Sequence, residues 1–164
     1  MRIKIFTVGG TIDKVYFDQK NTYQVGKPQV EKILNIAGVT FNYQIEQIIR
    51  KDSLDMNEED RQKVFKRVRE CEQNKILITH GTDTMVETGK KLQKIKDKTI
   101  VLTGSMQPAR FRDSDAIFNI GCAVGVLISS QPGTYIVMNG RRFQPENVKK
   151  NVQKSRFEIG NSKR

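Results

Sequence analysis

RIKIFTVGG, residues 2–10, is the stretch of sequence that decides the fold of this chain. Residues 2–8 form a short run rich in β-branched residues, and Gly9 and Gly10 follow directly, so the pattern predicts a buried first strand that ends in a tight loop. In sheets of parallel strands, ligands bind beyond the carboxyl ends of the strands. We therefore expect the loop that begins at Gly9 to lie where chemistry takes place.

Predicted helices and strands alternate along the rest of the chain. Residues 28–36 have apolar residues at helical spacing after Pro28, residues 40–49 alternate like a strand, and residues 57–73 predict an amphipathic helix with Asn57 as its N-cap. The apolar face of that last helix contains Val64, Phe65, Val68 and Cys71. Three more short runs predict strands, KILIT (75–79), TIVLT (99–103) and TYIVM (134–138), and helical stretches follow the first two. This alternation predicts an α/β fold, a mostly parallel sheet with helices on both faces in a flavodoxin-like three-layer sandwich.

The composition is that of one globular domain. The chain has 164 residues, of which 37% are hydrophobic and 29% charged, and we assign residues 1–164 to a single domain. No apolar run reaches the roughly 18 residues of a membrane span, and the start of the chain lacks the apolar core of a secretory signal. Cys71 and Cys122 have no disulfide or metal spacing and are interpreted as free thiols. We expect a cytoplasmic protein without a membrane attachment.

The chain is strongly basic, with a formal net charge of +11, a charge that would attract nucleic acid or a small anion. The lysines are scattered along polar faces, as in KKLQKIKDK (90–98), and no nucleic-acid-binding signature accompanies them. A solvated basic surface is therefore favoured over a nucleic-acid site.

Three polar loops follow apolar strands directly and should converge at one edge of the sheet: GGTID, HGTDT and GSMQPARFRDSD. The first exposes the hydroxyl of Thr11, although GGT is also an ordinary strand-to-loop turn. The second places Thr82 beside Asp83, and either Asp83 or Thr84 could instead cap the following helix.

The third loop, within residues 101–121, has two interpretations. Its polar residues could line a pocket: Ser105, Gln107, Arg110, Arg112, Asp113 and Asp115. Equally, Asp113 or Ser114 could cap the next helix and the arginines could be surface charges.

His80 is the only histidine, and we interpret it as a structural hydrogen-bonding residue because no serine or cysteine motif accompanies it. One histidine and two separated cysteines do not make a metal ligand set, and VGGTID has neither a Walker lysine nor GxGxxG spacing.

Five blocks together carry a resemblance that covers almost the whole chain: TVGGTID, KDSLDMNEED, ITHGTDTMVETG, VLTGSMQPARFRDSDAIFNIG and YIVMNGRRFQPENVKK. In this order they resemble the N-terminal catalytic domain of bacterial-type L-asparaginases and asparaginase-glutaminases. GGTI and HGTDT match the two signature segments of that family.

The resemblance implies hydrolysis of the side-chain amide of L-asparagine to L-aspartate and ammonia, without metal or organic cofactor. Thr11 matches the nucleophile and Tyr23 the tyrosine of the family's mobile loop, while Thr82, Asp83 and Lys150 match the second catalytic set. The pattern Val-x-Lys favours Lys150 over the adjacent Lys149.

The same resemblance implies the substrate contacts. Ser53 and Asp83 match residues that hold the α-carboxylate and α-amino group, with backbone groups near Gly10, Gly81 and Thr82 and a contact from Ser105. L-glutamine is the second candidate substrate.

Two departures from the family stand out. The family normally continues into a smaller C-terminal domain, whereas this chain ends at Arg164; we expect a natural short form that dimerises or forms a larger homo-oligomer. Leu54 replaces a glutamine of many periplasmic-type members, so DSLDM looks more like the cytoplasmic type. Two alternatives stay open, an amino-acid-binding module with lost or partner-dependent hydrolysis, and the ammonia-releasing component of a tRNA-dependent amidotransferase.

Overall fold

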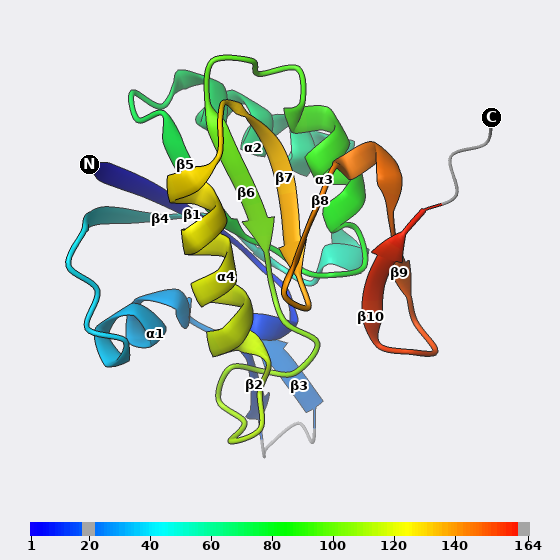
Figure 1. Cartoon of the computed structure of the whole chain (residues 1–164). Coiled ribbons are helices and arrows are strands. Elements are labelled where there is room, and N and C mark those ends of the chain that lie inside the picture. The colour runs from blue at the N-terminus through cyan, green and yellow to red at the C-terminus, as the bar shows by residue number, and fades with distance from the viewer. Residues whose placement is uncertain (18–21, 161–164) are drawn as a thin grey trace.

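The structure, a computed structural model, describes residues 1–17 and 22–160, so residues 161–164 of the predicted domain lie outside the described residues. Its centre is a six-stranded sheet in the order β4-β1-β5-β6-β7-β8 (Figure 1). The strands are β1 (Arg2–Gly9), β4 (Asn42–Lys51), β5 (Lys75–Thr79), β6 (Thr99–Thr103), β7 (Gly133–Met138) and β8 (Arg141–Phe143). The first five are parallel and β8 is antiparallel to β7. The strands at residues 2–8, 75–79, 99–103 and 134–138 are thus confirmed, as is the α/β class.

Helices cover both faces of the sheet, as the alternation predicts. The helices α1 (Val30–Ile36) and α4 (Ala116–Ser129) pack on one face, and α2 (Glu58–Glu70) and α3 (Met85–Leu92) pack on the other. Alternate residues of each central strand enter the two cores: Ile5 and Leu77 face α4, whereas Phe6 and Ile78 face α2 and α3.

The helix α2 begins as predicted. The Asn57 side chain accepts a hydrogen bond from the Asp60 N–H, and the Asp60 side chain accepts one from the Asn57 N–H, which makes a capping box. Val64 and Val68 are fully buried, with Phe65 and Cys71 packed against the same core.

The last crossover departs from the flavodoxin pattern. The connections β4-α2-β5 and β5-α3-β6 run toward β8 with their helices on one face of the sheet. The connection β1-α1-β4 runs in the opposite direction with its helix on the other face, so all three connections have the same hand. The connection β6-α4-β7 also runs toward β8, but its helix lies on the same face as α1. Its hand is therefore opposite to that of the other three connections. Because such crossovers are nearly always right-handed, β6-α4-β7 is the left-handed exception. To reach that face, residues 104–115 cross the end of the sheet, where the Ala109 N–H donates to the Ile12 carbonyl.

Two small hairpins beside the sheet were not predicted. The strands β2 (Lys14–Phe17) and β3 (Thr22–Val25) form one, and β9 (Val148–Asn151) and β10 (Arg156–Ile159) form the other. Both lie near the end of the sheet at which the parallel strands finish (Figure 1). Each strand has only four residues and is partly exposed, so neither gives a periodic apolar signal.

Two predicted helix starts need correction. The helix α1 begins at Val30 with Gln29 as its N-cap, so Pro28 precedes the helix instead of lying in its first turn. The N-cap position of α4 is Asp115, although its side chain makes no capping hydrogen bond and the Ser114 hydroxyl accepts from the Ala116 N–H instead. The Asp115 carboxylate accepts from the Met106 and Gln107 N–H groups and so fixes the loop in front of the helix.

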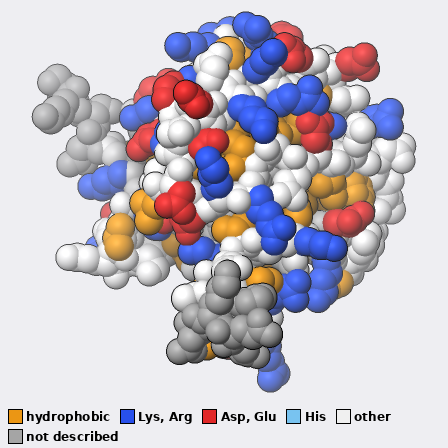
Figure 2. Space-filling view, turned by 180° about the vertical axis from the view of Figure 1, so that it is seen from behind, with side chains coloured by type: hydrophobic (Ala, Val, Ile, Leu, Met, Phe, Trp, Pro, Cys, Tyr) orange, Lys and Arg blue, Asp and Glu red, His pale blue; other side chains and the backbone are white. Residues whose placement is uncertain are grey.

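The basic residues are spread over the surface. On the face opposite to that of Figure 1, Lys and Arg side chains are interspersed with Asp and Glu (Figure 2). Several of them form ion pairs, among them Arg61–Glu87, Lys91–Glu58 and Arg67–Glu46. This distribution fits the solvated basic surface favoured from the sequence.

Candidate active site

Close backbone contacts bring the first two signature loops together. The Gly10 N–H donates to the Lys51 carbonyl at 3.0 Å. Gly10 has a φ of 91°, and a Cβ there would lie 2.3 Å from the Cα of Gly81. Only glycine fits this conformation and this space. Thr11 and Thr82 therefore follow two glycines that touch each other.

Ser53 lies against the second loop. A Cβ on Gly81 would lie 2.5 Å from the Ser53 Oγ, and the Thr84 hydroxyl donates to the Ser53 carbonyl at 2.9 Å. The Ser53 hydroxyl is buried and has no hydrogen-bond partner among the residues the structure describes. A buried hydroxyl without a partner is costly, and the Thr7, Thr79 and Thr134 hydroxyls are in the same state. Thr84 is the N-cap of α3, but its side chain makes no capping hydrogen bond.

The hairpin β9–β10 carries Lys150 to the second loop. The Lys150 Nζ donates to the Thr82 Oγ1 at 2.8 Å and to the Asp83 Oδ1 at 2.6 Å. Val148 is buried, Lys149 is exposed and Lys150 is partly buried, which is the alternation of a strand. This geometry favours Lys150 over Lys149, as the sequence pattern does.

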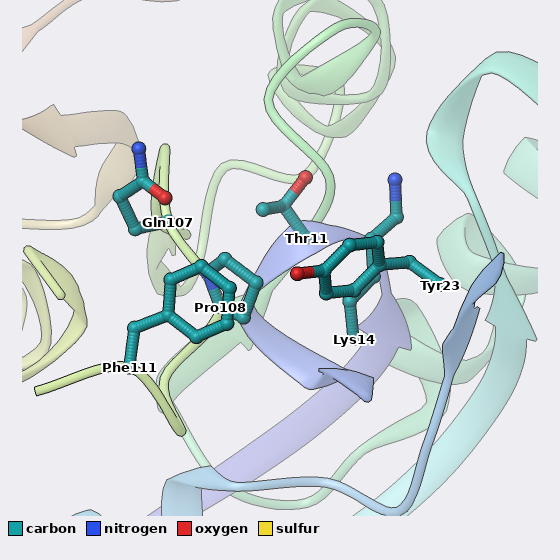
Figure 3. Close-up of a pocket in the computed structure, with 6 residues that line it drawn as sticks. All are labelled: Thr11, Lys14, Tyr23, Gln107, Pro108 and Phe111. Carbon is teal, nitrogen blue, oxygen red and sulfur yellow. The ribbon is translucent and has the colours of Figure 1, made fainter. Parts of the chain in front are cut away.

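Thr11 lines an open cavity of about 250 Å³ together with Lys14, Tyr23, Gln107, Pro108 and Phe111. The Tyr23 hydroxyl points into this cavity on the side of Thr11 and Pro108 (Figure 3). The Tyr23 ring packs edge-on against the Phe111 ring, with 6.1 Å between the ring centroids, and its centroid lies 5.3 Å from that of the Tyr16 ring. The loop of residues 104–115 therefore supplies one wall of the cavity and the hairpin β2–β3 supplies the other.

An ion pair joins this cavity to the Ser53 segment. The Lys14 Nζ lies 2.5 Å from the Asp52 Oδ2. Burial by itself would raise the pKa of Asp52, but hydrogen bonds from Lys14 and the Leu54 N–H, with the positive charges of Lys14 and Lys150, outweigh it and hold that pKa below its usual value. Asp52 thus stays ionised beside Lys14. The sequence pattern did not single out Lys14 or Asp52.

Asp13 is a second acidic residue that was missed. Its buried carboxylate accepts a hydrogen bond from the Gln29 N–H at 2.8 Å, and its carbonyl accepts one from the Gly26 N–H. Burial raises the pKa of Asp13 to about 6, although the Gln29 N–H and the charge of Arg50 act in the opposite direction. Asp13 ties the base of the Tyr23 hairpin to the start of α1.

Ser105 and Asp115 shape the third loop. The Ser105 side chain is buried and its hydroxyl donates to the Gln107 carbonyl, so it supports the loop and does not line the Thr11 cavity. Arg112 and Asp113 line a neighbouring hollow that shares Gln107 and Phe111 with that cavity.

His80 has the structural role expected of it. The ring is fully buried, its Nδ1 donates to the Gly81 carbonyl, and its Nε2 accepts from the Thr88 hydroxyl, both at 2.8 Å. Burial lowers the pKa of His80 to about 4, so the ring is neutral near pH 7 and holds the Gly81 loop in place.

The remaining sequence expectations concern thiols, metal ions and membranes. Cys71 and Cys122 are free thiols. Within residues 1–17 and 22–160, no group of three His, Cys, Asp or Glu side chains could hold a metal ion. No helix in these two stretches is long and apolar enough to span a bilayer.

The family described as Asparaginase, N-terminal matches residues 2–161. A glutaminase-asparaginase of Pseudomonas fluorescens biotype A is 33% identical over 166 residues, which cover 92% of this chain and 45% of the relative. Among solved structures, the thermostable L-asparaginase from Thermococcus kodakarensis matches 99% of this chain and 52% of its own with a TM-score of 0.84 and 26% identity. The match to a probable cytoplasmic L-asparaginase from Campylobacter jejuni covers 96% of this chain and 51% of the other, with a TM-score of 0.75 and 28% identity.

The chain spans about half the length of these relatives. The family match runs through every segment that builds the site described above, from the β1 loop to the Lys150 strand. The chain therefore belongs to the asparaginase family and corresponds to its N-terminal region.

Proposed function

We propose that this chain hydrolyses the side-chain amide of L-asparagine to L-aspartate and ammonia, with Thr11 as the nucleophile. The observation that carries the proposal is the position of Thr11, whose loop lies in direct contact with the loop in which Lys150 binds Thr82 and Asp83. A small amino-acid amide placed between the two loops would meet both hydroxyls.

The first half of the reaction forms an acyl-enzyme. The Thr11 Oγ attacks the amide carbon while Tyr23, which shares its cavity, accepts the hydroxyl proton. Backbone N–H groups near Gly10 and Gly81 stabilise the developing oxyanion. The C–N bond then breaks, leaving an ester between Thr11 and the aspartyl group.

The leaving nitrogen needs a proton, and Thr82 is suited to give it. Because the Lys150 ammonium donates to the Thr82 Oγ1, it makes the Thr82 hydroxyl a stronger acid, and Lys150 can replace the proton that Thr82 loses. In the second half, water attacks the ester and gives a proton back to Thr82 and Lys150. The C–O bond to Thr11 then breaks, the Thr11 Oγ takes back the proton that Tyr23 held, and L-aspartate is released. Asp83 keeps Lys150 in position throughout.

Ser53 and Asp83 hold the two ends of the substrate in this proposal. The unpartnered Ser53 hydroxyl accounts for one contact of the α-carboxylate, and the Asp83 carboxylate attracts the α-ammonium group. Ser105 acts through the loop that it supports. No organic cofactor takes part.

The test is ammonia release from L-asparagine and L-glutamine by the purified chain and by its Thr11→Ala and Thr82→Ala variants. We expect turnover of L-asparagine by the parent chain and a loss of at least roughly 1000-fold in each variant, with circular dichroism unchanged. Thr11→Ala removes the nucleophile, and Thr82→Ala removes the group that protonates the leaving nitrogen. Unchanged turnover in both variants would refute the proposal.

We also propose that the chain assembles as a homo-oligomer through α4. The exposed side of this helix shows Ile117, Phe118 and Ile128 at 55%, 59% and 44% exposure, and no residue from Ala116 to Ser129 is charged. Two copies that each carry +11 repel one another, so a contact between them requires an uncharged surface, which α4 supplies. The last described strand, β10, lies across the molecule from α4 (Figure 1), so we assign this surface to a second copy.

The oligomer proposal predicts a solution mass above that of one chain by light scattering. Phe118→Lys should reduce it to the mass of a monomer, whereas Lys32→Met on α1 should not. A monomeric parent chain would refute it.

We place the protein in the cytoplasm. The free cysteines support this placement, as does the similarity to the probable cytoplasmic L-asparaginase of Campylobacter jejuni. Cell fractionation that finds the protein in the periplasm would contradict it.

A further inference from the structure

The Thr11 cavity contains a cation to which the proposed reaction gives no role. Lys14 lines the cavity with Thr11 and Tyr23, and its ammonium group extends on the side of the cavity on which the Thr11 hydroxyl lies (Figure 3). Its side chain is 26% exposed, so the ammonium group is held at the cavity and remains accessible to a ligand.

One carboxylate fixes Lys14 in this position. Asp52 accepts from the Lys14 Nζ at 2.5 Å, and its backbone continues directly into Ser53, whose buried hydroxyl has no partner in the described parts of the chain. An ammonium group has three protons, and Asp52 takes one of them. The others are available to a second acceptor that enters the cavity.

The charges around the two threonines also suit a zwitterion. Lys14 pairs with Asp52 and Lys150 pairs with Asp83, so the four groups sum to zero. The charge of Lys150 also helps to hold the pKa of Asp52 below its usual value. A ligand with one carboxylate and one ammonium group can therefore enter without leaving a net charge, provided that its carboxylate meets a lysine and its ammonium group meets an aspartate.

We propose that Lys14 binds the α-carboxylate of the amino-acid substrate, beside Ser53, and so determines specificity for substrates with that carboxylate. The inference rests on the proposed function because it places the amino acid between Thr11 and Ser53. Asp52 holds the Lys14 side chain and is a positioning residue, whereas Lys14 itself touches the substrate.

The first experiment measures binding and turnover separately. Calorimetry gives the Kd of the product L-aspartate, and ammonia release gives KM and kcat for L-asparagine and for β-alaninamide, which has the same amide and amino group but no carboxylate. Lys14→Met should raise the Kd of L-aspartate and the KM for L-asparagine at least tenfold, with kcat changed less than threefold, and leave the KM for β-alaninamide unchanged. Lys14→Arg should restore most of the loss, and Lys32→Met, an exposed lysine on α1, should have no effect.

A second experiment excludes an indirect effect of the unpaired Asp52. Removing Lys14 leaves the Asp52 carboxylate free to repel the ligand, so the double variant Lys14→Met with Asp52→Asn is needed. It should bind L-aspartate as weakly as Lys14→Met does. Recovery of parent-like binding in the double variant would overturn the inference, because Lys14 would then only neutralise Asp52.

Failure of this inference is distinguishable from failure of the proposed function. Parent protein that binds L-aspartate through Lys14 but releases no ammonia would refute hydrolysis and support the carboxylate site. If the parent turns over L-asparagine and Lys14→Met raises the KM for L-asparagine and for β-alaninamide by the same factor, the carboxylate site is refuted and the proposed hydrolysis is not. Parent protein that does not bind L-aspartate would overturn the inference.

Discussion

Replacing Asp13 by asparagine should stabilise the protein at neutral pH, by an amount that depends on pH. The pKa of Asp13 rises from 3.8 to about 6 on folding because the carboxyl group is buried. Between these two values the unfolded chain has released its proton while the folded protein retains it, so the folded protein loses stability as pH rises through this range. At about 1.36 kcal/mol per pH unit, the full loss is about 3 kcal/mol above pH 6.

The asparagine side chain of the Asp13→Asn variant keeps an oxygen that can accept from the Gln29 N–H but cannot ionise. The difference in unfolding free energy between this variant and the parent should therefore grow by roughly 2 to 3 kcal/mol in favour of the variant between about pH 4 and pH 7.5. Urea unfolding followed by circular dichroism at a series of pH values measures this difference, and every other titrating group cancels in the subtraction.

The shape of the curve is the critical observation. A difference that is the same at the acidic and neutral ends of this range would show that the Asp13 pKa is not raised by folding and would refute the burial argument. A difference that changes in the opposite direction would mean that the ionised carboxylate is stabilised, as by a close cation.

Three further predictions concern neighbouring residues. In the Asp13→Asn background, the free energy of unfolding should fall by about 3 kcal/mol as pH drops from about 6.5 to 4. The reason is that the His80 pKa is about 4 in the folded protein, so in this range the unfolded chain binds a proton at His80 and the folded protein does not. Urea unfolding that shows no loss of stability over this range would contradict the prediction. Lys150→Met should lower kcat for L-asparagine at least roughly 100-fold while Lys149→Met stays within about twofold of the parent, and equal losses in steady-state assays would refute the assignment of Lys150. Gly81→Ala should cost about 1 to 3 kcal/mol in urea unfolding and raise KM, because the added methyl group would displace Ser53; a variant of parent stability and KM would show that the loops are not in tight contact.

The layers of the fold were predictable because the signal is strong where both faces of a strand are buried. Residues 75–79 and 99–103 are short, β-branched apolar runs, and the structure buries them against helices on both sides. The hand of the β6-α4-β7 crossover was not predictable, since a fully buried strand presents apolar side chains to both faces and the sequence does not show which face the next helix takes.

The candidate site was predicted in part. Thr11, Thr82, Asp83 and Lys150 were found through the resemblance, and the structure brings Lys150 to Thr82 and Asp83 across 68 and 67 positions of sequence. Lys14 and Asp13 were missed because a lysine or aspartate in a short polar segment is usually a solvated charge. Their significance depends on burial and on partners such as Asp52 and Gln29, which are distant in the sequence.

The central claim is that Thr11 forms a covalent bond with the substrate. The most direct measurement is mass spectrometry of protein mixed with L-asparagine and quenched in acid within one turnover, followed by digestion and analysis of the peptide that contains Thr11. We expect an aspartyl group on Thr11 in the parent and no aspartyl group on this peptide in Thr11→Ala. Release of ammonia with no modification on Thr11, or with the group on Thr82 alone, would contradict this account.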